Sequence, residues 1–250
     1  MTDGWLTHAS LPPPIPRNDR ERVSRVTPVV LVHGGMHGSW CWDPVRPFLT
    51  ARAVAVDLPG RGSRPADLAC VGLDDSVAAV LEDADRAGFD RFVLVGHSLG
   101  GVTITETAVR HPERVAALIY VGALVPGPGQ SPADLLIGEP SVAMPVLAED
   151  LARTLFGTGM DDETWAAHYA QLTPDAPGLM NAVVSGYPSG MPMTYLSMTL
   201  DQPVPPELAA QMAANLGPRA EHRIIADAGH TIMTTHPELL ASIINGSTAD

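Results

Sequence analysis

The chain has 250 residues, with 15 basic and 28 acidic side chains, and its formal net charge is −13. This length allows one domain with a sizeable core, or a core domain that carries an insertion. The negative charge disfavours contact with a phosphate backbone or an anionic lipid surface, so no nucleic-acid or membrane partner is expected. All 15 basic residues are arginines. Without lysine the chain cannot form a Schiff base or a Walker A phosphate loop.

The first 27 residues are rich in proline and then in charged residues, and they predict an N-terminal arm. They contain no continuous apolar stretch of the signal-peptide type, and no run in the chain approaches the roughly 20 apolar residues that span a bilayer. The two cysteines, Cys41 and Cys70, form no CxxC pair. A cytoplasmic location is therefore expected. The absence of lysine, whose codons are A-rich, suggests a GC-rich bacterial source.

Short apolar runs alternate with helical patterns along most of the chain. Such runs suit strands that are buried on both faces, and the alternation predicts a parallel α/β sheet flanked by helices. A final helix is expected from Thr235, with Glu238 in capping-box order and an apolar face of Leu239, Leu240, Ile243 and Ile244. Strands are expected at residues 28–33, 53–62, 91–98, 114–123, 194–199 and 222–228, and earlier helices at 74–87, from 100 onward and at 206–215.

The alternation stops between residues 126 and 193, where prolines, methionines and short helical patterns follow one another. We interpret this stretch as a helical cap inserted between two strands of the core. The predicted organisation is thus an arm at 1–27, a core at 28–125 and 194–250, and a cap at 126–193.

A serine nucleophile is predicted at Ser98. The segment Gly96-His97-Ser98-Leu99-Gly100 fits the pattern G-x-S-x-G, with a predicted strand before it and a predicted helix after it. A serine at such a sharp turn has a strained backbone, and its hydroxyl stands above the edge of the sheet. The alternative is a glycine-rich turn that only packs a helix on a strand, but strand, glycines, serine and helix all agree.

A serine hydroxyl needs a base, and the base needs an acid that orients it. His230 lies in a glycine-containing loop after the last predicted strand, which is where a base can reach the serine. Asp201 follows the predicted strand at residues 194–199 and is favoured as the acid. Asp227 is the alternative, but it stands only three residues from His230, and so short a loop leaves little room to aim its carboxylate at the imidazole. Five other histidines are interpreted as loop, cap or helix-end residues, namely His33, His37, His97, His111 and His236, and His168 is interpreted as a solvated helix residue.

His33 and His37 stand four residues apart in "LVHGGMHGSW", a spacing that also occurs in metal sites. The glycines between them follow a buried strand rather than a helix, and no third ligand is identifiable. Gly60-Arg61-Gly62 does not complete a dinucleotide-binding pattern. Neither a metal nor a cofactor is therefore expected.

The segments "VVLVHGGMHGSWCW", "VDLPGRG", "LVGHSLGG", "TYLSMTLDQPVPPELAAQM" and "DAGHTIMTTHPELL" together resemble the α/β-hydrolase superfamily. Within it they are most similar to the branch of small bacterial carboxylesterases, plant methyl esterases and plant hydroxynitrile lyases. The resemblance implies an α/β-hydrolase fold in which Ser98, His230 and Asp201 are nucleophile, base and acid. It also implies an oxyanion hole formed by the backbone N–H groups of Gly35 and Leu99.

The lyases of this branch carry a threonine beside the oxyanion loop and a lysine directly after the catalytic histidine. Here these positions are Gly34 and Thr231. The resemblance therefore points to the esterase side, with a small or medium-sized carboxylic ester as substrate, and it is compatible with a homodimer. The substrate pocket is expected between core and cap, with the candidate wall residues Met36, Leu124, Phe156, Trp165 and Met193.

Two other functions stay open on the sequence. The same scaffold could serve a natural-product tailoring enzyme that releases a thioester, closes a ring or cleaves a C–C bond. A ligand-binding relic without turnover is less favoured, because such proteins usually lose a triad residue and all three positions are occupied here.

Overall fold

The computed structural model describes residues 26–136 and 144–248, so the predicted arm at 1–27 lies almost wholly outside the described residues. The centre is a sheet of six strands in the order β2-β1-β3-β4-β5-β6, and every neighbouring pair is parallel. This confirms the predicted parallel α/β architecture. The strands are β1 (Val29–Val32), β2 (Ala53–Val56), β3 (Phe92–His97), β4 (Val115–Val121), β5 (Met193–Met198) and β6 (Ala220–Ile225).

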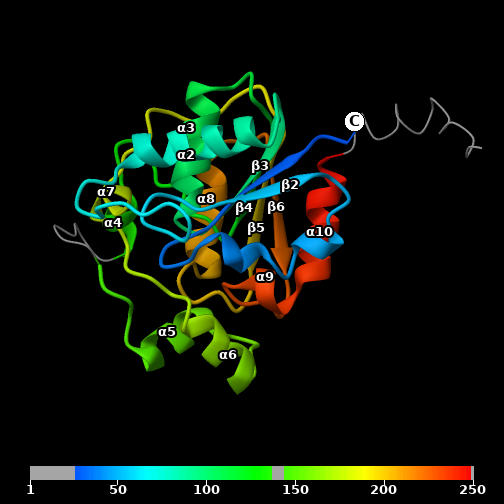
Figure 1. The fold of residues 1–250 in the computed structure, drawn as a ribbon. Helices are drawn as coiled ribbons and strands as arrows, with labels where there is room; N and C mark the ends of the chain where they lie inside the picture. The colour runs from blue at the N-terminus through cyan, green and yellow to red at the C-terminus, as the bar shows by residue number, and fades with distance from the viewer. Residues whose placement is uncertain (1–25, 137–143, 249–250) are drawn as a thin grey trace, which may run out of the picture.

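Helices cover both faces of the sheet (Figure 1). Side chains of a strand alternate between the two faces. In β1, Val30 and Val32 accordingly pack toward α2, α3 and α8, while Val29 and Leu31 pack toward η1, α9 and α10. The covering helices are η1 (Ser39–Trp42), η2 (Arg46–Phe48), α2 (Leu73–Arg86), α3 (Gly100–Arg110), α8 (Pro206–Asn215), α9 (Ile232–Thr235) and α10 (Pro237–Gly246). Burial on both faces explains why β1, β3 and β4 are almost entirely apolar, whereas the edge strand β6 is mostly exposed and contains Glu221, His222 and Arg223.

Four more helices lie between β4 and β5, in the segment that we call the insertion (the described residues among 126–192). Figure 1 shows α5 and α6 as a pair that stands outside the two layers, while α4 and α7 lie elsewhere, beside the core. Leu179 and Met180 of α7 belong to the same apolar cluster as α2 and α3. The bounds are α4 (Pro132–Leu136), α5 (Glu149–Phe156), α6 (Asp162–Tyr169) and α7 (Pro177–Met180).

The last helix begins differently from the prediction. Helix α10 begins at Pro237 after a separate short helix α9, and its N-cap residue His236 makes no side-chain capping bond. The expected capping box of Thr235 and Glu238 is therefore wrong. Leu240 and Ile244 are buried, but Leu239 is 43% exposed, because it lies on the solvent side of the helix.

The topology decides where a site can form. The chain leaves β1 toward β2 on one side, and β3 then pairs with the other side of β1. In open parallel sheets, ligands bind at such a reversal, outside the carboxyl ends of the strands. The loop after β1 begins at His33 and the loop after β3 begins at Ser98, so both lie at this point. Within the described ranges, no helix combines the length and apolar character that crossing a bilayer requires.

Candidate active site

Ser98 occupies a strained turn between β3 and α3. Its φ of 51° lies in the left-handed region, which is unfavourable for a residue with a Cβ. Backbone hydrogen bonds hold this conformation: Ser98 N donates to Val121 O at 3.1 Å, and Ser98 O accepts from Gly101 N and Leu124 N at 2.9 Å each. Strained residues that persist in this way concentrate at functional sites.

Two glycines let neighbouring chain pass close to this turn. A Cβ on Gly34 would lie 2.7 Å from Cβ of Ser98, and a Cβ on Gly100 would lie 2.5 Å from the carbonyl oxygen of His33. Real Cβ atoms do not approach other atoms so closely. The glycines therefore bring the loop after β1 directly against the serine.

His230 and Asp201 form a buried pair at the ends of β5 and β6. Nδ1 of His230 lies 3.0 Å from Oδ1 and 2.9 Å from Oδ2 of Asp201, and the two side chains are 1% and 0% exposed. Asp201 Oδ1 also accepts the N–H of Val204 at 2.8 Å, which fixes the carboxylate. The rival Asp227 is exposed and makes no such contact with His230. Because Nδ1 is bonded to Asp201, Nε2 is the ring nitrogen of His230 that is left for another partner.

His97, the residue before Ser98, connects the Ser98 turn to His230. Its Nε2 donates to the carbonyl oxygen of His230 at 3.0 Å, and the two rings lie 4.6 Å apart. This contact places His230 beside the Ser98 turn. Burial is the main cause that lowers the pKa of His97 well below its ordinary value, so the ring is neutral at neutral pH.

The loop after β1 carries the predicted oxyanion donor, Gly35, and His33 orients it. Nδ1 of His33 donates to Gly34 O at 2.8 Å, and its Nε2 accepts the N–H of Leu58 at 3.1 Å. Gly34 O and Gly35 N belong to one planar peptide unit, so this bond also sets the direction of the Gly35 N–H. Burial lowers the pKa of His33 to about 4, which keeps this tautomer neutral.

The next peptide of the loop is fixed by His37. Its Nδ1 donates to Gly35 O at 2.7 Å, and its Nε2 lies 3.0 Å from Nε2 of His168 in α6. All four ring nitrogens of His33 and His37 are thus bonded to protein groups, which explains their spacing without a metal. In the described part of the chain, no cluster of three or more His, Cys, Asp or Glu side chains could hold a metal ion.

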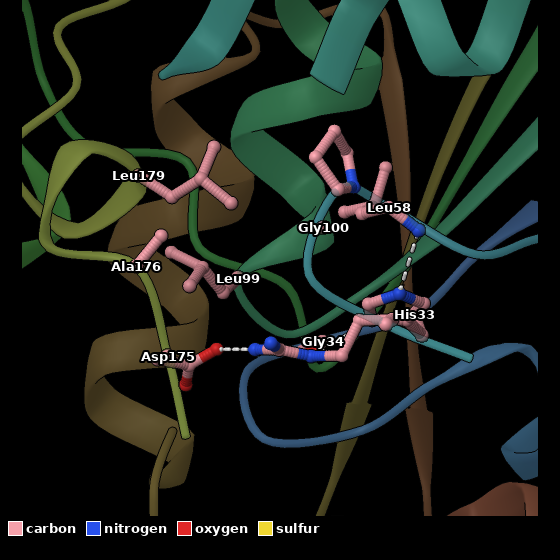
Figure 2. A pocket seen from close by; sticks show the side chains of 10 residues that line it. His33, Gly34, Leu58, Leu99, Gly100, Asp175, Ala176 and Leu179 are labelled. Atoms are coloured by element: carbon pink, nitrogen blue, oxygen red, sulfur yellow. Dashed lines mark hydrogen bonds and ion pairs between the residues drawn. The ribbon is translucent and has the colours of Figure 1, made fainter. Parts of the chain in front are cut away.

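A buried ion pair joins the insertion to the core beside this loop. Arg61 and Asp175 form a direct charge-assisted hydrogen bond, and each side chain is 5% exposed. Arg61 Nε also donates to His37 O at 2.9 Å. Both residues line a small cavity together with Gly34 and Leu99. Figure 2 shows Asp175 with these two residues. The cavity volume is about 10 Å³, which can hold at most a single water molecule and not a substrate.

Thr231 directly follows His230 and connects it to the insertion. Its hydroxyl donates to the carbonyl oxygen of Phe156, at the end of α5. The Phe156 ring stacks on His230 with centroids 5.8 Å apart. Thr231 is thus engaged by the protein rather than turned toward a ligand.

The expected wall residues fall into three places. Met36 and Phe156 belong to one apolar cluster next to His37 and His230, and Leu124 is bonded through its N–H to Ser98 O. Trp165 lies within the insertion, where its ring stacks on His168. Met193 begins β5 at the opposite end from Asp201. The expectation for Met193 does not hold, because the length of β5 separates it from the site.

The sequence analysis also misplaced His168. Only 4% of this residue is exposed, because its ring packs against Trp165, Trp40 and His37. Trp165, His168 and Leu172 repeat at helical spacing, which is the signal that could have predicted a buried face. No comparable local signal marks Arg61 and Asp175, which are 114 residues apart.

Curated relatives share sequence with part of the chain. A pyrethroid hydrolase of Sphingobium wenxiniae is 37% identical over 125 residues, which is 48% of this chain and 44% of that protein. Esterase PIR7B of Oryza sativa subsp. japonica is 40% identical over 107 residues, which is 40% of each chain. The chain spans less than half the length of these curated relatives that it matches.

Solved structures match over most of the chain. An extracellular α/β-hydrolase from a Paenibacillus species has a TM-score of 0.76 at 21% identity, and the match covers 90% of this chain and 100% of that chain. The pyrethroid hydrolase PytH has a TM-score of 0.72 at 26% identity, with 88% and 97% covered. The first of these shows the fold alone. The family model described as "Alpha/beta hydrolase family" matches residues 29–243, and the chain therefore belongs to the alpha/beta hydrolase family.

Proposed function

We propose that this protein is a serine hydrolase that cleaves a small or medium-sized carboxylic ester through an acyl-enzyme. The observation that carries the proposal is the buried Asp201–His230 pair, which His97 places beside the strained Ser98 turn. Members of the family that are named esterase, methylesterase and pyrethroid hydrolase support the reaction class.

In the proposed reaction, Ser98 Oγ attacks the ester carbonyl while Nε2 of His230 takes the serine proton. Asp201 holds the Nδ1–H tautomer of His230 and stabilises the imidazolium ion that forms. His230 then gives the proton to the leaving alcohol, and a water molecule activated by the same nitrogen releases the acyl group.

The negative charge on the carbonyl oxygen would be held by the N–H groups of Gly35 and Leu99. Neither amide donates a hydrogen bond to another group among the residues that the structure describes. Removing one such donor from an acyl-transfer enzyme costs roughly 3–4 kcal/mol of transition-state stabilisation. The bond from His33 to Gly34 O keeps the Gly35 amide in one direction, so little reorganisation is needed during the reaction.

Three observations favour ester hydrolysis over cyanide release. The chain has no lysine that could stabilise departing cyanide, and Thr231 is bonded to Phe156 O. A threonine side chain at position 34 would collide with Ser98, as its Cβ alone would lie 2.7 Å away. The apolar side chains of Met36 and Phe156 near His230 suit an apolar acyl or alcohol group.

The decisive experiment compares Ser98→Ala with Ser197→Ala on a panel of esters and thioesters of increasing acyl length. Ser197 is the control, because it is a buried serine whose hydroxyl lies 2.8 Å from Nε2 of a histidine, His222, but it lies outside the site. We expect kcat of Ser98→Ala to fall by roughly 10⁴-fold or more, with unchanged activity in the control.

Labelling with a fluorophosphonate reports on the nucleophile independently of substrate choice. Wild-type protein should be labelled at Ser98, and Ser98→Ala should not be labelled. Full ester hydrolysis by Ser98→Ala would overturn the proposal. Labelling of Ser98 together with turnover of thioesters alone would favour a tailoring enzyme on the same scaffold.

A further inference from the structure

Two histidines meet across the boundary between the sheet and the insertion. His37 lies in the loop after β1, and His168 lies in α6, 131 residues later in the chain. Their Nε2 atoms are 3.0 Å apart, and the residues are 1% and 4% exposed. Two imidazole nitrogens at this distance share one proton, so one ring must donate and the other must accept.

The direction of this hydrogen bond follows from the other partner of His37. Its Nδ1 faces Gly35 O, an oxygen that can only accept, so the proton of neutral His37 is on Nδ1. Nε2 of His37 is then the acceptor, and His168 donates its Nε2–H. Burial lowers the pKa of both rings, that of His168 to about 4, so both are neutral at neutral pH.

The insertion also bonds the neighbouring residue of the loop. Met36 has a φ of 60°, a strained value for a residue with a side chain. Its carbonyl oxygen accepts the N–H of Thr173 at 2.9 Å, and its own N–H is bonded to the carboxylate of Asp175. Met36, the strained residue that follows Gly35, is therefore held by bonds to the insertion and not by bonds to the sheet.

We propose that His168 is a positioning residue of the oxyanion hole. It fixes the His37 ring and thereby the Gly35–Met36 peptide, which is joined at the Cα of Gly35 to the peptide that carries the Gly35 N–H. The inference rests on the proposed function, because it assigns a task to Gly35 in that reaction. The oxyanion hole then depends on both parts of the protein. The core supplies the donor, Gly35, and the insertion supplies His168, which helps to orient it.

Two substitutions of His168 separate the hydrogen bond from the packing. His168→Phe keeps an aromatic ring against Trp165 and Trp40, but it cannot donate to His37. His168→Gln loses the ring, but its amide nitrogen can replace Nε2 as a donor. We expect kcat of His168→Phe to fall ~10- to 100-fold with KM within about threefold, and His168→Gln to retain most of the wild-type kcat.

His222→Phe is the matched control, because His222 also bonds a side chain and packs on an aromatic ring, that of Tyr195, but lies outside the site. It should leave kcat unchanged. His168→Phe should also have no further effect in a His37→Phe background, because His168 acts only through His37. Full kcat in His168→Phe, or losses that simply multiply in the double variant, would overturn the inference.

A second measurement needs no turnover. In the Ser98→Ala protein, nitrogen-15 NMR should detect protonated Nδ1 on His37 and protonated Nε2 on His168, assigned by the loss of each signal in the corresponding variant. A protonated Nε2 on His37 would contradict the inference. If the wild type hydrolyses no ester and Ser98 resists fluorophosphonate, the proposed function fails, while the NMR result still decides whether the pair exists as described.

Discussion

The two sides of the active site are held by different kinds of bonds. On the Ser98 side, backbone groups of β4 and α3 bind the turn, and glycines give it room. On the Gly35 side, side chains of His33, His37 and Asp175 bind the loop, and the last of these comes from the insertion. The proposed nucleophile is thus fixed by backbone bonds to the sheet and α3, whereas the proposed oxyanion loop is fixed by side chains, of which Asp175 is remote in the sequence.

The largest expected effect on kcat concerns the Ser98 side, through the acid that is proposed to orient His230. Asp201→Asn should lower kcat by ~10³- to 10⁴-fold, because an amide cannot hold the Nδ1–H tautomer of His230 or stabilise its cation. The fold should be retained, since the Asn carbonyl can still accept the N–H of Val204. Steady-state kinetics and thermal melting measure the two properties.

Asp227→Asn is the control for this substitution, because Asp227 is the other acid near His230 in sequence. It is exposed, so its replacement should change kcat less than about twofold. Equal losses in the two variants would refute the assignment of Asp201 as the acid.

The next largest effect is on the free energy of unfolding and tests the Gly35 side, where the insertion contacts the loop after β1. Asp175→Ala leaves the Arg61 cation buried without its partner, and breaking such a pair costs about 3–5 kcal/mol in the free energy of unfolding. Asp162→Ala removes the partner of Arg153 in an exposed pair, and should cost less than about 1 kcal/mol. Urea unfolding monitored by tryptophan fluorescence measures both.

Replacing both partners, as Arg61→Met with Asp175→Leu, should recover most of that loss, because no unpaired charge then remains buried. The ester-hydrolysing activity should be low in Asp175→Ala and in this double variant alike, since Met36 loses the carboxylate that binds its N–H in both. Recovered stability together with full activity would show that the oxyanion loop does not need the insertion.

The effect that is smallest for each single residue is spread over the whole histidine cluster. Burial lowers the pKa of His33, His37, His97 and His168, and an unfolded chain regains the ordinary value near 6.5. As pH falls below about 6.5, the unfolded chain therefore binds protons that the folded protein excludes. The free energy of unfolding should then decrease by up to ~1.4 kcal/mol per pH unit for each of these histidines.

Urea unfolding at several values between pH 7.5 and pH 5 checks this slope. Burial raises the pKa of the Asp175 carboxyl group, so protonation of that group would oppose the trend at the acid end of the titration. His111→Gln should leave the slope unchanged, since the His111 side chain is 37% exposed. A free energy of unfolding that is constant over this range would contradict the burial of the cluster.

The same contrast explains which features the sequence could predict. Strands β1, β3 and β4 were predicted because burial on both faces leaves a simple apolar pattern, and Ser98 was predicted because its turn requires glycines within a few residues. His168 and Asp175 carry no such local requirement. Their burial depends on how the insertion packs against the core beside the loop after β1. The residues that they contact, His37 and Arg61, are more than 100 positions away in the sequence.

Met193 and Leu239 failed for a related reason. An apolar residue in a strand or helix can face the core, a neighbouring helix or solvent, and periodicity assigns the face less well near the end of an element. Met193 starts β5 and Leu239 is in the first turn of α10. Both are ordinary apolar residues by sequence, and only the three-dimensional packing shows that Met193 lies away from the site and that Leu239 lies away from the core.

The bond from Thr231 to the carbonyl oxygen of Phe156 has a consequence for protein engineering. Together with His168 and Asp175, it makes the insertion an unsuitable unit for simple exchange between relatives with different substrates. A transplanted insertion must bring a donor to His37, a carboxylate to Arg61 and a carbonyl oxygen to Thr231. Chimeras designed on pocket shape alone would receive a new binding surface and lose the alignment of the groups that react.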